Sequence, residues 1–163
     1  MSLFFLDQQE SIETIDCLAV NIGRSQLLVP MPAGAEIILN QAPEQGDQLP
    51  SWVAGWIPWR HLNIPLIDFG ALQSGGTASD FGASTRILVL NSFGEGHSHH
   101  YYAIMTRGFP HTLRVEADCE MTTQSATENG NCIKIDLQVD SEKLLLPDFS
   151  QIETYLKKIP LYY

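Results

Sequence analysis

The stretch LPSWVAGWIPWRHLNIPLIDF, residues 49–69, is the densest apolar region of the chain. Its apolar residues form two runs, 52–59 and 62–69, which Arg60 and His61 separate. Short runs that are rich in aliphatic and aromatic residues are typical of strands. We therefore predict two strands in this stretch, with a bend between them.

Three tryptophans, Trp52, Trp56 and Trp59, lie within eight residues of this stretch. Successive side chains of a strand point to opposite faces, so Trp56 faces away from Trp59 and both faces carry large apolar groups. Such a strand lies between two layers or is partly exposed to a partner. Because tryptophan and arginine are enriched at the centres of interfaces, the sequence leaves both core packing and an interface open for Trp59 and Arg60.

Further strands are predicted on both sides of the stretch. Gly23 to Ser25 turns the chain between two short runs, and the run 132–139 alternates cleanly between apolar and polar residues. No helical pattern separates the strands, which argues against βαβ units and favours small barrels or a sandwich. The other predicted strands cover 18–22, 26–29, 35–39, 86–93, 101–106, 112–115 and 144–146, which makes about ten in all.

The two ends of the chain differ from this β pattern. Residues 1–16 are predicted to be an N-terminal arm or a short amphipathic helix, and residues 17–160 to be one domain with a flexible loop at about 73–84. Apolar residues at helical spacing predict a helix at 151–159. Its expected cap is a capping box of Ser150 and Glu153.

The composition narrows the classes of partner. Nineteen acids against nine bases give a net charge of −10, which repels phosphate backbones, so we expect neither nucleic acid nor an anionic membrane as a partner. No run approaches the ~18 to 20 apolar residues of a membrane span. Cys17, Cys119 and Cys132 form no CxxC pair, which favours reduced cysteines and a cytoplasmic protein.

The catalytic motifs of the common enzyme classes are missing from the sequence, which predicts no enzyme, no cofactor and no metal. No hydrolase, metalloprotease, P-loop or dinucleotide motif is present. Asp68 is expected to cap a turn, and the acids around Cys119 are expected to raise the pKa of its thiol. A metal-binding or small-ligand barrel that uses the loop 95–100 remains an alternative, as does a self-associating structural module. For that loop we expect a polar hairpin connection whose histidines face water.

The central stretch resembles the signature of the CheW-like family at Pro50, Gly55, Arg60, Pro65 and Asp68. That signature runs from a proline through a glycine and a strand to an arginine at a tight turn, and then to an apolar strand with a proline and an acid. The resemblance covers about residues 17–158. It extends to the hairpin 18–29, the segments 35–37, 86–90, 102–105 and 108–109, and the C-terminal strand and helix 143–156.

The resemblance implies a mainly β fold of two intertwined five-stranded SH3-like barrels with a C-terminal helix. It implies a non-catalytic adaptor that couples methyl-accepting chemoreceptors to a CheA-type histidine kinase. The implied partners are the regulatory domain of the kinase and the cytoplasmic tip of the receptors, which binds a groove between the barrels. Carried over by position, the partner-binding residues are Glu36, Ile37, Trp59, Arg60, Gly108 and Phe109.

The sequence also departs from the pattern of the family. The family's N-L-R-G is Pro58-Trp59-Arg60-His61 here, and Arg107 stands where an acid is expected before Gly108. In these departures the chain resembles divergent accessory adaptors of type IV pili chemosensory systems, which regulate twitching motility. The oligomeric state is left open.

Overall fold

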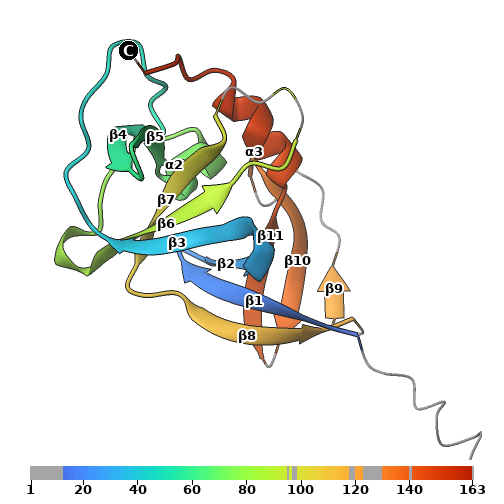
Figure 1. Cartoon of the computed structure of the whole chain (residues 1–163). Helices are drawn as coiled ribbons and strands as arrows, with labels where there is room; N and C mark the ends of the chain where they lie inside the picture. Colours follow the sequence, from blue (N-terminus) through green and yellow to red (C-terminus); the bar gives the residue numbers. More distant parts are fainter. Residues whose placement is uncertain are drawn as a thin grey trace, which may run out of the picture.

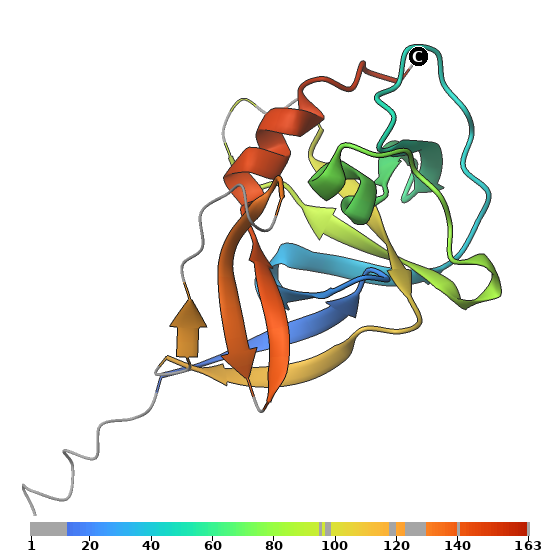
Figure 2. The same ribbon diagram turned by 180° about the vertical axis from the view of Figure 1, so that it is seen from behind.

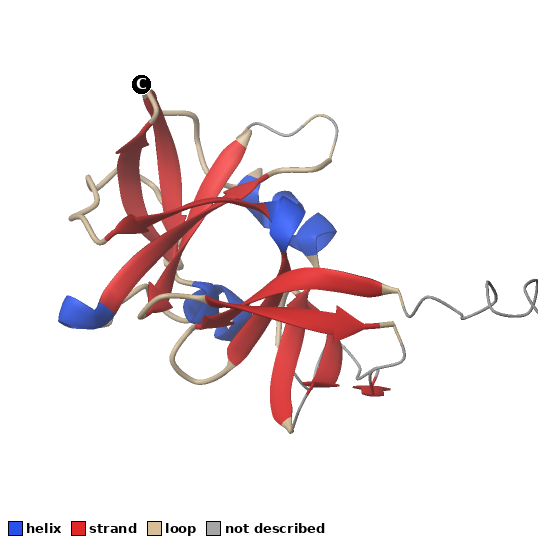
Figure 3. Ribbon diagram, turned by 60° about the horizontal axis from the view of Figure 1, so that its bottom comes forward, coloured by secondary structure: helices blue, strands red, loops and turns tan. Residues whose placement is uncertain are grey.

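The computed structural model describes residues 13–94, 96, 99–117, 120–122, 130–139 and 141–162, with backbone only for 120–122. Its strands belong to two sheets, which Figures 1 and 3 show as two groups. Of the predicted N-terminal arm, residues 1–12 lie outside the described residues, and Thr14 already begins the first strand. No helix among the described residues is long and apolar enough to cross a membrane.

Sheet A, the six-stranded sheet, joins both ends of the chain, with the strand order β8-β1-β2-β11-β10-β9. The hairpin β1–β2 pairs antiparallel, and β11 adds to β2 in parallel. Its strands are β1 (Thr14–Asn21), β2 (Gln26–Pro30), β8 (His111–Glu116), β9 (Glu120–Thr122), β10 (Ile133–Val139) and β11 (Glu142–Pro147).

Sheet B, the five-stranded sheet, contains the middle of the chain in the order β3-β6-β7-β5-β4. The chain enters it from β2 through the short helix η1 (Met31–Ala33) and leaves it between β7 and β8, so the two sheets are intertwined. The predicted mainly β fold of two intertwined five-stranded units is thereby confirmed, with the short strand β9 as a sixth strand of sheet A. The strands of sheet B are β3 (Gly34–Leu39), β4 (Val53–Trp59), β5 (Leu62–Ile67), β6 (Thr85–Asn91) and β7 (Tyr101–Arg107).

The two sheets repeat one local arrangement. In each, the strand that adds in parallel to a hairpin leads through an Asp-Phe pair into a helix. Asp68 accepts a hydrogen bond from the N–H of Ala71 at 3.1 Å and caps α2 (Phe69–Ser74). Asp148 accepts from the N–H of Gln151 at 3.0 Å and caps α3 (Phe149–Leu156), which follows β11 in Figure 2. Asp68 therefore has the capping role that the sequence predicts.

Three features differ from the sequence predictions. Residues 69–74 form α2 although no interior helix was expected, because six residues are too few to show a helical period. The capping box of Ser150 and Glu153 is wrong: Asp148 caps α3, and the Glu153 carboxylate instead accepts hydrogen bonds from the backbone of Phe93 and Gly94. Three short elements, β9, η1 and η2 (Gly82–Ser84), were also not predicted.

The buried side chains form three clusters, one inside each sheet and a larger one between the sheets. Trp56 belongs to the cluster between the sheets, whereas Trp59 belongs to the core of sheet B. The two side chains therefore lie on opposite faces of β4, as the alternation of strand residues predicts. At 4% and 6% exposure both tryptophans are core residues.

Candidate functional site

The turn between β4 and β5 fixes the position of Arg60. Trp59 pairs with Leu62, so Arg60 and His61 form a two-residue hairpin turn. Their φ angles of 45° and 64° are both left-handed, as in a type I′ turn, whose twist matches that of the flanking strands. The strands thus impose an uncommon backbone conformation on Arg60 and direct its side chain, which is 64% exposed, into solvent.

Glu36 joins this turn from the opposite edge of sheet B. Its Oε2 accepts a hydrogen bond of 2.7 Å from Nε1 of Trp59 and lies 3.7 Å from a terminal nitrogen of Arg60. The Arg60 guanidinium carbon lies 4.6 Å from the centre of the Trp59 ring. Since β3 and β4 are the two edge strands of sheet B, these contacts close the sheet through side chains. We call Glu36, Trp59 and Arg60 the docking corner.

The three residues of the docking corner have different tasks. The Trp59 ring is buried and packs against Tyr101 at 4.8 Å between ring centres, while its N–H is held by a carboxylate. A hydrogen bond to a charged group contributes about 1.5 to 3 kcal/mol, whereas an exposed ion pair contributes below about 1 kcal/mol. Trp59 and Glu36 therefore build the corner, and Arg60 remains available for a partner.

A second cluster lies on the other face of β3. Ile37 and Leu39 alternate with Glu36 and are 36% and 70% exposed. Leu39 pairs with Arg86 on β6, and the guanidinium of Arg86 lies 4.7 Å from the ring centre of Phe109, which is 66% exposed. We call Ile37, Leu39, Arg86 and Phe109 the apolar rim.

Gly108 holds the start of the connection that carries Phe109. Its φ of 71° is left-handed, a conformation that glycine adopts without steric cost. Its N–H donates to the carbonyl of Ser84 at 2.7 Å, and its carbonyl accepts from the hydroxyl of Thr106 at 2.7 Å. Gly108 therefore sets the direction in which the chain leaves β7, and with it the position of Phe109.

The six residues suggested by the resemblance thus fall into two neighbouring groups on sheet B. Glu36, Trp59 and Arg60 contact one another, whereas Ile37, Gly108 and Phe109 belong to the other side of β3 or to the end of β7. Sequence reasoning missed Leu39 and Arg86. Leu39 could have been found from the alternation that makes it share a face with Ile37.

The loop histidines do not all face water. His99 is buried, its Nε2 lies 3.2 Å from the carbonyl oxygen of Ile159, and its ring lies 5.8 Å from that of Trp56. Burial lowers the pKa of His99, so the neutral form is favoured. The expectation that this loop has only solvent-facing histidines is therefore wrong at His99, whereas His100 is exposed.

Metal and thiol chemistry find little support in the described part of the chain. No group of three or more His, Cys, Asp or Glu side chains is close enough to hold a metal ion there, while Glu95, His97 and Cys119 lie outside it. Burial raises the pKa of the Cys132 thiol to about 12, which keeps it protonated and unreactive.

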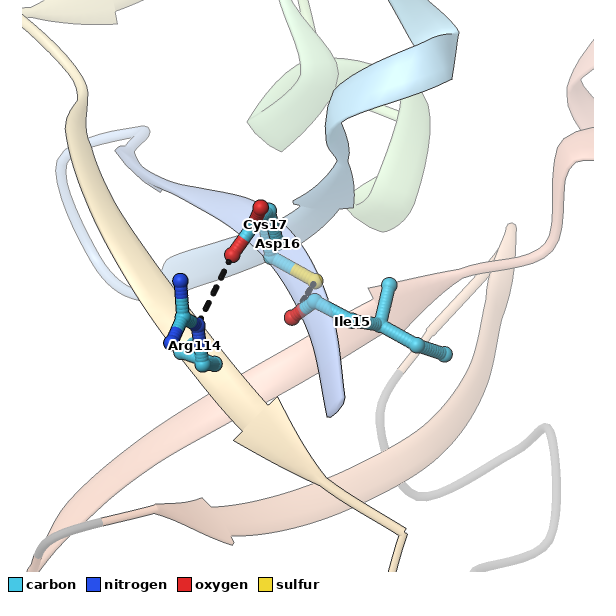
Figure 4. Close-up of polar contacts among 4 residues, drawn as sticks. All are labelled: Ile15, Asp16, Cys17 and Arg114. Atoms are coloured by element: carbon cyan, nitrogen blue, oxygen red, sulfur yellow. Dashed lines mark hydrogen bonds and ion pairs between the residues drawn. The ribbon is translucent and has the colours of Figure 1, made fainter. Parts of the chain in front are cut away.

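Sheet A carries a polar contact of a different kind. Nε of Arg114 on β8 lies 3.2 Å from Oδ1 of Asp16 on β1, and both side chains are about 70% exposed (Figure 4). Next to it the Sγ of Cys17 donates to the carbonyl of Ile15 at 3.7 Å. An exposed ion pair of this kind adds little to stability, so Arg114 is a useful control for variants of Arg60.

Taken together, the fold and the site define a β scaffold that presents side chains for docking. Comparisons with known proteins specify the class further. The CheW-like domain family matches residues 16–152. None of the curated proteins compared with the chain matches it significantly.

A solved structure with the same fold is the crystal structure of the scaffolding protein TtCheW from Thermoanaerobacter tengcongensis. It aligns with a TM-score of 0.69 at 10% sequence identity, covering 86% of this chain and 88% of TtCheW. The chain belongs to the CheW-like domain family. Because this is a family of non-catalytic scaffolds, the chain is a chemosensory signalling adaptor domain and not an enzyme.

Proposed function

We propose that this adaptor couples methyl-accepting chemoreceptors to a CheA-type histidine kinase, with the docking corner and the apolar rim as its receptor-binding surface. The observation that carries the proposal is the Glu36–Trp59–Arg60 contact. It fixes an exposed arginine beside a buried tryptophan at the closure of sheet B. Preorganised arginine and aromatic side chains of this kind are typical of interface hot spots.

The composition of the two clusters suits a helical receptor tip. Ile37, Leu39 and Phe109 offer exposed apolar surface, and Arg60 and Arg86 offer cations beside it. An amphipathic helix docks its apolar side on such a surface and places carboxylates near the arginines. The coupling then follows from geometry, because the adaptor holds receptor tip and kinase at a fixed spacing.

For the kinase, we propose that its regulatory domain binds a different surface of the same scaffold, so both partners are held at once. Transient signalling contacts of this kind are modest in area. The adaptor would act in the cytoplasm and be recruited to receptor arrays at the inner membrane.

We further propose that the output is type IV pili twitching motility rather than flagellar swimming. The support is the set of departures from the family pattern, chiefly Pro58-Trp59-Arg60-His61 and Arg107. Deleting the gene should abolish twitching and leave swimming unchanged. The opposite phenotype would assign the adaptor to the flagellar pathway.

The coupling is tested with the purified receptor tip and the kinase regulatory domain from the same organism, each immobilised separately. Both should bind the wild-type chain, and Arg60→Glu should weaken receptor binding about tenfold or more, because a hot-spot arginine contributes about 2 kcal/mol. Arg114→Glu is the matched control and should bind like the wild type.

Circular dichroism of Arg60→Glu should match that of the wild-type chain, since Arg60 is exposed. Equal receptor binding by both variants and the wild type would contradict the proposed surface. Failure of the wild-type chain to bind either partner would contradict the coupling function itself.

A further inference from the structure

A groove of about 980 Å³ lies between the two sheets. Sheet A contributes the β1–β2 turn and β11, and sheet B contributes α2, the segment after it and the end of β7. None of the six residues suggested for partner binding lines this groove. The groove is therefore lined by other residues than the proposed receptor surface, so the six residues do not lie in this groove, and Arg107 at its edge is two residues before Phe109 of the apolar rim.

The charge of the groove is opposite to that of the chain. Arg24, Arg107 and Lys143 line it, a third of the nine bases in a chain of net charge −10. Asp68 is the one acidic lining residue among those that the structure describes, and both oxygens of that carboxylate already accept backbone N–H groups, from Ala71 and Ser79. The groove thus concentrates positive charge, which attracts an anion over a Debye length of about 8 Å.

Two of the three cations have no acidic partner in the part of the chain that the structure describes. Lys143 lies 3.7 Å from the buried carboxylate of Asp136, which partly neutralises it. Arg107 stacks over the Phe81 ring at 5.2 Å, and Arg24 makes no ion pair within the described residues. Arg24 stands on an exposed turn, so its charge can meet a ligand without rearrangement of the fold.

The walls of the groove fit a peptide better than an enclosed small molecule. Arg24, Ser74, Thr77 and Ser79 are all exposed, so the groove is open along its walls. Phe81 supplies an apolar surface, and the hydroxyls of Thr77 and Ser79 can bond to a passing backbone. Small-molecule sites, in contrast, bury most of the ligand surface.

From these observations we propose that the groove binds an extended acidic segment of a partner protein, whose carboxylates pair with Arg24 and Arg107. Because the chain as a whole is acidic, its remaining surface repels such a segment and the groove attracts it. This would give the adaptor a second docking site, on the face that carries α2.

The test is a titration of the ¹⁵N-labelled full chain with a capped hexaglutamate peptide, followed by amide chemical shifts at low salt. Shifts should concentrate at Gly23, Gly76 and Ser79 and vanish in about 0.3 M salt. Arg24→Glu should weaken binding about tenfold, whereas Arg114→Glu, on the exposed Arg114–Asp16 pair, should change it less than about twofold. Arg107→Gln is a second variant that should also weaken binding.

Capped hexaglutamine is the neutral control peptide and should cause no shifts at these amides. The proposal would be overturned if hexaglutamate shifted none of the groove amides, or if Arg114→Glu weakened binding as much as Arg24→Glu. Inorganic phosphate is the last ligand to be tested, as a competitor of hexaglutamate. If phosphate shifted the same amides and displaced hexaglutamate completely, the groove would be a small-anion site instead of a peptide site.

Discussion

Sheets A and B share one strand arrangement but are filled with different residues. The core of sheet B contains Trp59 and packs against the rings of Tyr101 and Phe81. The core of sheet A consists of Cys17, Ala19, Leu28, Val115, Leu137 and Leu144, with no aromatic ring among its described residues.

Side chains also close sheet B at its edges. A hydrogen bond from the buried Trp59 ring on β4 to the Glu36 carboxylate on β3 joins the two edge strands of sheet B. We therefore call sheet B the closed half of the molecule. The surface that we assign to the receptor belongs to the closed half, where a preorganised side chain loses less entropy on binding.

The largest losses of stability are expected when one core residue of each sheet is replaced by alanine. Trp59→Ala should destabilise the chain by about 4 kcal/mol, because it removes a large buried ring and leaves the Glu36 carboxylate without its donor. Leu144→Ala, at a fully buried position of sheet A, should cost about 3 kcal/mol. Urea unfolding of both variants measures the difference. A smaller loss of unfolding free energy for Trp59→Ala than for Leu144→Ala would contradict the larger contribution that we assign to the Trp59 site.

Replacing either of the two capping aspartates should reduce stability by a smaller amount. Asp68 accepts two backbone hydrogen bonds, from Ala71 and Ser79, whereas the Asp148 side chain accepts one cap bond, from Gln151. Asp68→Ala should therefore cost about 2 kcal/mol and Asp148→Ala about 1 kcal/mol. Thermal unfolding separates the two. Equal losses would mean that the bond to Ser79 contributes nothing to stability.

The smallest effect is a pH dependence of the free energy of unfolding. It is expected from His99, which contacts Ile159 where the C-terminal segment packs on sheet B. Burial lowers the pKa of His99 below its usual 6.5, so the unfolded chain binds more protons than the folded one just below pH 6.5. The stability contributed by neutral His99 is therefore lost as the pH falls from 6.5 to the folded pKa, by at most about 1.4 kcal/mol per pH unit.

Urea unfolding at about pH 7.5 and about pH 5.5, on either side of the usual histidine pKa, measures this loss. His99→Gln is the control because glutamine can still donate to the Ile159 carbonyl. The wild-type chain should lose more stability than the variant between the two pH values. An identical loss in both would exclude His99 as the titrating group.

The sequence predicted most strands because alternation and turn residues are local signals, and the resemblance supplied the six candidate positions. The sequence could not show which of these six side chains contact one another in the fold. Glu36 and Trp59 are 23 residues apart and come from opposite edges of sheet B, so their contact depends on how the sheet closes. Residue 69, read as the end of a strand, begins α2 instead, because Asp68 caps a helix too short to show a period.

Hydrogen exchange of the full chain, with and without the receptor tip, tests most directly whether the closed half binds the receptor. We predict slower exchange in β3, in the turn between β4 and β5, and around Gly108, with no change in β10 and β11. Protection confined to the strands of sheet A, or no protection although the receptor tip binds, would contradict the assignment of the receptor site to the docking corner and the apolar rim.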